Sequence, residues 1–412
     1  MSEKLTNRWL IVVGALLIQV ALGAVYIWSV FKGPLMEMFG WEAAATNLTF
    51  SISLMTFAIG TVVFGKLQDK IGPRKVATIG GILLCLGLIL ASKTTSIGWI
   101  YLTFGVIGGA GIGAGYVCPL ATCVKWFPDK KGLISGLAVA GFGAGALVFT
   151  PVAKNFINNF GVLSTFAYLG IIFGIIVILG AQLLKNPPAG YKPAGWNPPA
   201  PVGGKAVAEN YTTGEMIKTT KFYLIWVSYL FGCAAGLMII GNALPIAQVQ
   251  GLSEALAASA IMTVSIFNSL GRLFWGAMSD KLGRIKSLMI IFLICGITML
   301  SLKLLTGAAI LIGVSIIGLC FGGFLAIYPS LTADMYGTKY LGMNYGTVFM
   351  AYGAGAIFGP MLYDFIKSPI EGQLSATPLM ISGVLCFISL ILLSVVKKQQ
   401  EAGFENAKKL NA

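Results

Sequence analysis

A single arginine interrupts one of the long apolar stretches of this sequence, at position 272 within residues 257–286. At about 1.5 Å of rise per helical residue, its Cα atom lies about 9 Å inside the end of the apolar run, near Met278. An arginine at this depth in hydrocarbon costs between about 2.5 and well over 10 kcal/mol, so such residues usually face a bundle interior or a watery cavity. We therefore expect Arg272 to line a cavity and to mark a pathway through the membrane; the alternative is that its side chain extends to the nearer membrane interface.

The neighbours of Arg272 form a polar stripe along the expected helix. Ser265, Asn268 and Arg272 are spaced i, i+3, i+7, so they share one face. The opposite face is expected to carry the apolar residues Ile261, Val264 and Trp275. A polar stripe on an apolar helix is typical of a cavity lining. Asn268 is therefore a candidate for binding the ligand or supporting the arginine, with interhelical hydrogen bonding as the alternative.

The composition is that of a membrane protein. Of the 412 residues, 57% are hydrophobic and only 10% are charged, and the mean hydropathy is +0.86. Soluble proteins carry about 25% charged residues. The net charge of +14 lies in short loops between apolar runs, which fits the orientation of membrane helices better than nucleic-acid binding.

Twelve apolar runs are long enough to cross a bilayer as helices, which takes about 17 to 25 residues. They fall at 9–31, 46–66, 76–92, 98–122, 133–153, 163–185, 222–246, 257–278, 287–304, 307–331, 343–366 and 377–396. The first run is longer than a signal-peptide core and no small-residue cleavage pattern follows it, so we expect it to remain as a helix. The expected fold class is an all-α membrane protein.

Four regions are expected along the chain. Residues 1–185 and 221–396 form an N-terminal and a C-terminal six-helix bundle. Residues 186–220 contain NPPAGYKPAGWNPPAPVGG, which cannot form a continuous helix and indicates a linker. Lysine and arginine concentrate in this linker, in the loops on the same side and in a tail at 397–412. Both termini are therefore expected in the cytoplasm, and the protein in the plasma membrane.

The two halves of the chain are copies of one another. The segment GKLQDKIGPRK at 65–75 aligns with GAMSDKLGRIK at 276–286, an offset of 211 residues. Further on, with an offset of 210 residues, Gly132, Gly136, Gly143 and Gly145 align with Gly342, Gly346, Gly353 and Gly355. Two parallel six-helix repeats are typical of transporters that bind substrate between moving halves. The glycines indicate close helix packing.

Each repeated segment contains the pattern G-x-x-x-D-K-x-G, which resembles the loop signature of the major facilitator superfamily. A carboxylate at a helix end beside basic residues can hold two parts of a transporter together in one state and release them in another. Asp69 and Asp280 are therefore expected to act in gating rather than in ligand binding. The basic residues expected to act with them are Lys70, Arg74, Lys281 and Arg284.

A second resemblance runs through both halves but not the linker. The segments YIWSVF, KWFPDKKGL, GRLFWGAMSDKLGR and MNYGTVFMAYGAGAIFG are similar to the oxalate/formate antiporter family and, more distantly, to the monocarboxylate transporters. In that family an arginine of the eighth helix binds the substrate carboxylate, and Arg272 occupies its place. The resemblance also implies an aromatic surround for the substrate, at Tyr26, Tyr116 and Phe142. Leu325 fills the tenth-helix place of that surround.

One position departs from the family pattern. The oxalate carrier has a second cation, a lysine eight residues after the asparagine of the NYG motif, where this chain has Tyr352. A dianion desolvated against one cation would keep an unpaired negative charge, at a cost of several kcal/mol, whereas a monoanion needs one partner. Tyrosine and asparagine groups can take a hydroxyl or keto oxygen. The sequence thus favours lactate, pyruvate, glycolate or formate over oxalate.

Three tyrosines have an alternative role. Tyr116 lies in GIGAGYVCP, where the glycines thin the helix and Pro119 would kink it, so the ring either lines a cavity or packs between helices. Tyr328, in the equivalent helix, has the same two alternatives. Tyr26 precedes Trp28 near a helix end, so it could also belong to an interfacial aromatic belt.

Groups for catalysis and metal binding are missing from the apolar runs. There is no histidine, the fourteen carboxylates lie at helix ends, in loops or in the tail, and the seven cysteines form no CxxC pair. We therefore expect no enzymatic activity, no cofactor and no metal. Glu254, Asp334 and Asp364 are peripheral candidates for proton coupling.

The sequence as a whole predicts a monomeric secondary transporter that carries small monocarboxylate anions by alternating access, with proton symport or anion exchange as the coupling. Oxalate/formate exchange is the nearest alternative. An exporter of hydrophobic or cationic compounds is the alternative of another class, because one fold can serve many substrates. A cationic substrate would require a carboxylate inside the membrane, where this chain has an arginine instead. The expected partners are the anion, the bilayer and a proton.

Overall fold

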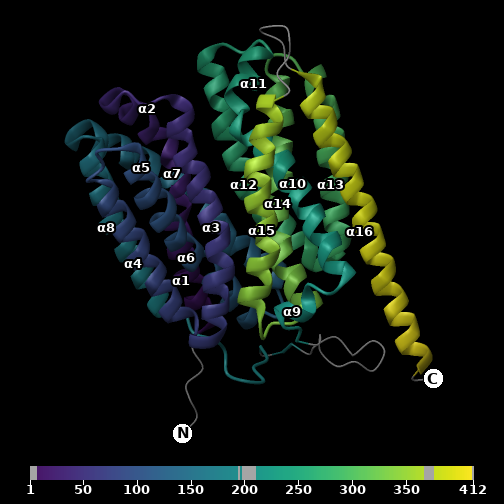
Figure 1. The fold of residues 1–412 in the computed structure, drawn as a ribbon. Helices are drawn as coiled ribbons and strands as arrows, with labels where there is room; N and C mark the ends of the chain where they lie inside the picture. The colour runs from purple at the N-terminus through teal and green to yellow at the C-terminus, as the bar shows by residue number, and fades with distance from the viewer. Residues whose placement is uncertain (1–6, 194, 197–209, 366–374, 411–412) are drawn as a thin grey trace. The chain divides into compact units, whose positions relative to one another are not determined.

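The computed structural model describes residues 7–193, 195–196, 210–365 and 375–410, and in this part of the chain every regular element is a helix (Figure 1). The first half contains α1 (Arg8–Gly23), η1 (Ala24–Ile27), α2 (Trp28–Phe39), α3 (Ala43–Ile71), α4 (Pro73–Ala91), α5 (Ile97–Ile100), η2 (Tyr101–Gly108), α6 (Gly109–Trp126), α7 (Lys131–Phe160) and α8 (Val162–Leu183). The second half contains α9 (Thr213–Met216), α10 (Thr220–Gly241), α11 (Ala243–Val249), α12 (Glu254–Leu282), α13 (Arg284–Ser301), η3 (Leu302–Leu304), α14 (Ala309–Tyr336), α15 (Leu341–Phe365) and α16 (Ala376–Leu410).

Among the described residues, ten helices are long and apolar enough to cross a membrane. They coincide with ten of the twelve runs expected from the sequence, and the other two runs fall within α12 and α15. The helix α16 continues to Leu410, through much of the segment expected as a tail. The expected linker contains one helical turn, α9, whose N-terminus is capped by Thr212 and Glu215.

Two of the membrane-length helices are not regular throughout. The first changes from α-helix to 3-10 helix over Ala24–Ile27, and the fourth is a π-helix over Tyr101–Gly108. The sequence around the first break, VYIW, consists of β-branched and aromatic residues with low helix propensity. The pattern of apolar residues predicts only the length of such helices, so neither break was expected.

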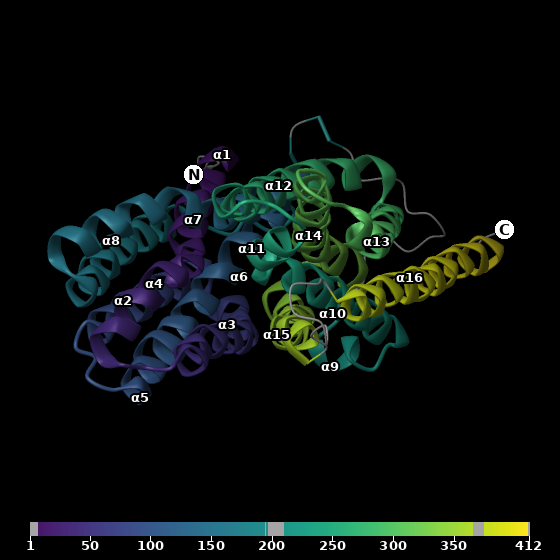
Figure 2. The same ribbon diagram turned by 90° about the horizontal axis from the view of Figure 1, so that it is seen from above.

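The chain forms two compact units. Unit 1 contains Met1–Pro128, Ala138–Pro193 and Lys339–Gly353, and unit 2 contains Asp129–Leu137, Ala194–Thr338 and Ala354–Ala412. The first turns of α7 thus belong to unit 2, and the first half of α15 belongs to unit 1. Within unit 1, α4 packs along α8, and within unit 2, α12 packs along α14 (Figure 2).

The repeated glycines allow helix backbones to touch. In unit 2, a Cβ atom on Gly136 of α7 would overlap the backbone carbonyl oxygen of Arg272. In unit 1, a Cβ atom on Gly346 of α15 would overlap the backbone carbonyl oxygen of Thr61. The positions 61 and 272 are equivalent in the two repeats, so the same close contact occurs in each unit. The packing role expected for these glycines therefore has a direct structural cause.

Candidate functional site

Arg272 lies on the packed side of α12. Its side chain is 0% exposed, and its Nε atom donates a hydrogen bond to Oδ1 of Asn268, one turn earlier, at 3.1 Å. Asn268 is itself only 8% exposed. The amide oxygen orients the guanidinium without adding a negative charge, and the planar fork of an arginine suits a carboxylate.

The stripe around Arg272 differs from the one expected. Val264 and Trp275 were placed opposite the arginine, but they are 1% and 5% exposed and lie on the same packed side. The opposite face, which is exposed, consists of Ile266, Phe267, Leu270 and Phe274. Ser265 donates to the carbonyl oxygen of Ile261, so its hydroxyl is used within the helix. At 100° per residue, positions 264, 268, 272 and 275 form one stripe, which explains the difference.

Glycines bring the neighbouring helix close to this stripe. A Cβ atom on Gly322 of α14 would overlap the carbonyl oxygen of Asn268 and lie 2.8 Å from the backbone nitrogen of Arg272. A Cβ atom on Gly271 of α12 would likewise overlap the carbonyl oxygen of Leu319 on α14. These contacts leave little freedom to the backbone that carries the arginine. A rigid backbone is what a pre-organised binding residue requires.

The predicted aromatic residues of unit 1 form one cluster. The ring of Tyr26 packs edge-on against Phe142 with centroids 5.5 Å apart, and Tyr116 packs against Phe142 at 5.2 Å. Phe57 joins them, because its ring centroid lies 5.0 Å from that of Tyr116 and 6.1 Å from that of Tyr352. We call Tyr26, Phe57, Tyr116, Phe142, Phe349 and Tyr352 the aromatic cluster.

Phe57 and Phe349 were not identified from the sequence. Phe349 stacks on Tyr352 with centroids 4.7 Å apart and lies 5.2 Å from Phe57. The repeat register contained a signal for Phe57, since an offset of 211 residues places it at the position equivalent to Asn268. Nothing in the spacing distinguishes Phe349 from the other aromatic residues of its helix.

Two polar contacts fix the cluster. The hydroxyl groups of Tyr26 and Tyr352 are hydrogen-bonded at 2.9 Å. The side chain of Gln19, which is 0% exposed, donates to the backbone carbonyl oxygen of Tyr116 at 3.3 Å. Trp28 is 3% exposed, so it is packed inside the bundle rather than in an exposed aromatic belt.

Two further predicted residues belong to unit 2 and have other contacts. The hydroxyl of Tyr328 is hydrogen-bonded to that of Ser228 at 2.7 Å, and its ring stacks on Tyr229 with centroids 4.0 Å apart. Leu325 is 2% exposed. Both side chains are thus packed within unit 2, and the contacts of Tyr328 favour the packing alternative for that residue.

The carboxylate of Asp69 binds the first turn of a helix from the other repeat. Its two oxygens accept hydrogen bonds from the backbone N–H groups of Gly342 and Met343, at 3.1 and 2.9 Å. Gln68 donates a third bond at 3.0 Å. A negative charge at a helix N-terminus is favourable because the N–H groups there have no partner within the helix. The chain turns just after Asp69, at Gly72, whose φ of 91° favours glycine.

Asp280 makes the equivalent contact in unit 2. Its two oxygens accept from the backbone N–H groups of Gly132 and Leu133 at the start of α7, at 2.9 and 2.8 Å. The guanidinium of Arg284 forms an ion pair with Asp280 at 2.7 Å and another with Asp334 at 3.0 Å. The turn after Asp280 contains a glycine with φ of 89°.

Asp334 is also paired with Lys131 at 2.7 Å. These two ion pairs favour a structural role for Asp334 over proton transfer. The side chains of the other two coupling candidates, Glu254 and Asp364, lie outside the described residues. The remaining basic residues expected to act in gating are exposed: Lys70, Arg74 and Lys281.

Comparison with known proteins gives consistent results. The family model described as Major Facilitator Superfamily matches residues 9–360 and 237–410. The chain is 33% identical to an uncharacterised transporter of this type, YhjX of Escherichia coli, over 86% of this chain and 87% of that protein. It is 30% identical to the oxalate:formate antiporter of Oxalobacter formigenes, over 95% and 92% of the two chains.

More distant matches agree on the fold. The chain is 25% identical to monocarboxylate transporter 12 of Xenopus laevis, over 96% of this chain and 91% of that one. A crystal structure of the transporter FucP in the outward conformation superposes with a TM-score of 0.70 at 14% identity, covering 93% of this chain and 98% of the other.

Proposed function

Because the chain belongs to the major facilitator superfamily, we propose that it transports small monocarboxylate anions such as lactate, pyruvate or formate by alternating access. The observation that carries the proposal is Arg272, a fully buried guanidinium in the middle of α12 that is oriented by the neutral amide of Asn268. A desolvated guanidinium and a carboxylate form two parallel charge-assisted hydrogen bonds. The names of two relatives, an oxalate:formate antiporter and a monocarboxylate transporter, support a carboxylate as the substrate.

The neutral side chains of the aromatic cluster favour a substrate with a single negative charge. Tyr352, at the position of the second cation in the family pattern, is hydrogen-bonded to Tyr26 within the aromatic cluster. The hydroxyl groups of these tyrosines can bind a hydroxyl or keto oxygen, and the rings can contact the apolar part of a small acid. A dianion would find no second positive charge at position 352. Oxalate/formate exchange is the second candidate, favoured by the relative that is 30% identical over 95% of this chain.

Gating is assigned to the two loop carboxylates. Asp69 and Asp280 each bind the first turn of a helix from the opposite repeat, so breaking these bonds would release one repeat from the other. We assign the two repeats to the six-helix bundles at 1–185 and 221–396, joined by the linker at 186–220. The lysine and arginine residues of the loops support cytoplasmic termini, a cytoplasmic linker and a location in the plasma membrane. We further propose that the protein is a monomer without enzymatic activity.

Coupling is to a proton or to a second anion. A proton taken up with lactate would change the pH inside vesicles, whereas exchange would require an anion on the opposite side. Glu254 and Asp364 remain the peripheral carboxylates available for a proton relay. Asp334 is less suited, because its charge is matched by two cations.

The experiment is an uptake panel in reconstituted vesicles, with lactate, pyruvate, formate, oxalate and the neutral analogue lactamide. The wild-type protein is expected to take up monocarboxylates in preference to oxalate and not to take up lactamide. The variant Tyr352→Lys adds a second cation and is expected to raise the oxalate-to-lactate ratio by about tenfold, equivalent to about 1.4 kcal/mol. Preference of the wild-type protein for oxalate would overturn the proposed substrate class.

A further inference from the structure

The first membrane helix changes its form at the residues around Tyr26. Over Ala24–Ile27 it is a 3-10 helix, and the backbone ψ angles at Gly23, Ala24 and Ile27 are −14°, −11° and 1°. A 3-10 stretch in the middle of a helix has poorer hydrogen-bond geometry than the α-helix and often marks a hinge. Tyr26, a proposed substrate contact, therefore lies in the least regular part of its helix.

The aromatic side of this segment is tightly packed. A Cβ atom on Gly23 would overlap the backbone carbonyl oxygen of Phe142. The ring of Tyr26 packs against that of Phe142, and its hydroxyl is bonded to Tyr352. The segment has no room to move in this direction.

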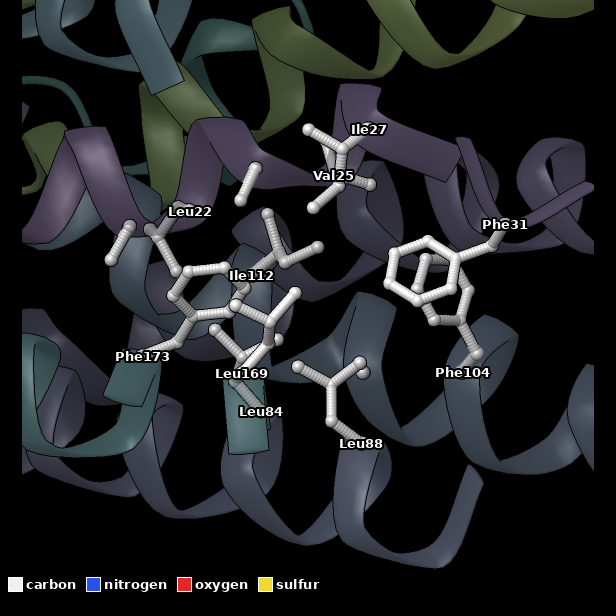
Figure 3. Close-up of a pocket in the computed structure, with 13 residues that line it drawn as sticks. Leu22, Val25, Ile27, Phe31, Leu84, Leu88, Phe104, Ile112, Leu169 and Phe173 are labelled. Carbon is white, nitrogen blue, oxygen red and sulfur yellow. The ribbon is translucent and has the colours of Figure 1, made fainter. Parts of the chain in front are cut away.

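The other side of the segment borders a small apolar cavity that is partly open. Ala24, Val25 and Ile27 line this cavity of about 20 Å³, together with apolar residues of α1, α2, α4, η2, α6 and α8 (Figure 3). A space with such a lining holds no ordered water, because a buried water needs polar partners. The cavity gives the segment room to move away from the aromatic cluster.

A second irregular segment borders the same cavity. Phe104 and Gly108 belong to the π-helix η2. The ring of Phe104 packs on Trp28, the residue that follows the 3-10 segment, with centroids 4.6 Å apart. π-Helices are rare and occur frequently at functional sites. The two irregular segments thus border the same cavity, and the π-helix contacts the residue that follows the 3-10 segment.

We propose that Ala24–Ile27 is a hinge that carries Tyr26 away from Tyr352 during transport, and that the cavity receives Val25 and Ile27 when the segment moves. Opening the pair of hydroxyl groups separates Tyr26 from Tyr352, and closing it restores the aromatic cluster. The role of Tyr26 in this step rests on the proposed function. The movement of the segment itself does not depend on the identity of the substrate.

The variant Gly108→Ala tests the hinge by filling the cavity. A Cβ atom at position 108 would meet only the carbonyl oxygen of Thr103, at an ordinary contact distance of 3.6 Å. The added methyl group reduces the void and favours a regular helix over the π-helix. We expect amide hydrogen exchange in a peptide covering residues 20–35 to slow by about threefold or more, and the turnover rate to fall, with thermal stability unchanged or raised.

The matched control is Gly98→Ala, which adds the same methyl group near the start of the same membrane helix, where no other atom lies within 4 Å. This control is expected to leave exchange in residues 20–35 unchanged. The variant Val25→Ala enlarges the cavity and is expected to speed exchange there, which provides a second test if Gly108→Ala does not fold. Unchanged exchange in both cavity variants would overturn the hinge. Absence of monocarboxylate uptake by the wild-type protein would overturn the proposed function and leave the exchange result standing.

Discussion

The helices α3 and α12 are the same element of the two repeats, and they differ where chemistry is required. In each unit a glycine of a partner helix touches a backbone carbonyl in the middle of the element, at Thr61 and at Arg272. Each element ends in a carboxylate that binds the first turn of that partner helix. The backbone arrangement is therefore common to both repeats.

The side chains in the middle of α3 and α12 differ. Asn268 and Arg272 of α12 correspond to Phe57 and Thr61 of α3 at the offset of 211 residues. Phe57 is the hub of the aromatic cluster, and the hydroxyl of Thr61 donates to the carbonyl oxygen of Ala58 in its own helix. The helix packing and the carboxylate–helix contact are thus present in both repeats, whereas the cation is found in one repeat and the apolar hub in the other.

The ends of the two helices differ as well. Asp280 shares Arg284 with Asp334, so its contact with α7 belongs to a network of charges. Asp69 receives its third hydrogen bond from the neutral amide of Gln68. The two carboxylate–helix contacts therefore share the same backbone hydrogen bonds. Asp280 adds a close ion pair, whereas the nearest interaction of Asp69 with a cation is at longer range, with Lys125.

The largest expected effect comes from the apolar hub. Phe57→Ala removes a fully buried ring from the aromatic cluster and should lower the free energy of unfolding by about 3 kcal/mol. The same truncation at the equivalent position, Asn268→Ala, should cost about 1 kcal/mol, because it removes one hydrogen bond and a smaller side chain. Thermal unfolding of both variants in one detergent measures the difference. Equal losses would contradict the division of roles between the two repeats.

The next effect comes from a charge placed beside the arginine. In Asn268→Asp the introduced carboxylate competes with the substrate for Arg272, so lactate affinity near neutral pH should fall by about 100-fold, equivalent to about 2.7 kcal/mol. Dissociation constants measured at pH 7 test this, with Asn268→Ala as the control that removes the amide without adding a charge. Equal losses of affinity in the two variants would show that position 268 acts only through packing.

The smallest effect distinguishes the two gates. Asp280→Asn removes an ion pair with Arg284 as well as the charge that binds two backbone N–H groups, and it should cost about 2 kcal/mol of stability. Asp69→Asn removes the charge that binds its helix and that interacts at longer range with Lys125, and it should cost about 1 kcal/mol. The two melting temperatures, recorded at low and high salt, measure this. Equal shifts would mean that the charge network adds nothing to the gate of unit 2.

The sequence predicted the parts of this protein that depend on periodic patterns. The apolar runs placed the starts of the membrane helices to within about three residues, whereas several helices continue beyond the expected end, such as α7 to Phe160 and α16 to Leu410. The repeat register identified the glycines of the close helix contacts. Arg272 was identified from the sequence as a candidate site residue because one charge in an apolar run is a strong signal. The 3-10 segment at Ala24–Ile27 and the hub residue Phe57 were not found, because an aromatic residue in an apolar helix looks the same whether it faces lipid or other rings. The prediction that Trp275 lies on the face opposite Arg272 was wrong, since only the packing of α12 shows which side of the helix is covered.

The central claim is that the guanidinium of Arg272 binds the carboxylate of the substrate, and affinity for lactate in Arg272→Lys tests it most directly. Lysine keeps the positive charge but loses the planar fork that forms two parallel hydrogen bonds. We predict that the variant remains folded, as judged by its melting temperature, and that its affinity for lactate falls by more than about tenfold while lactamide binding stays negligible. Wild-type lactate affinity in the folded variant would contradict the claim.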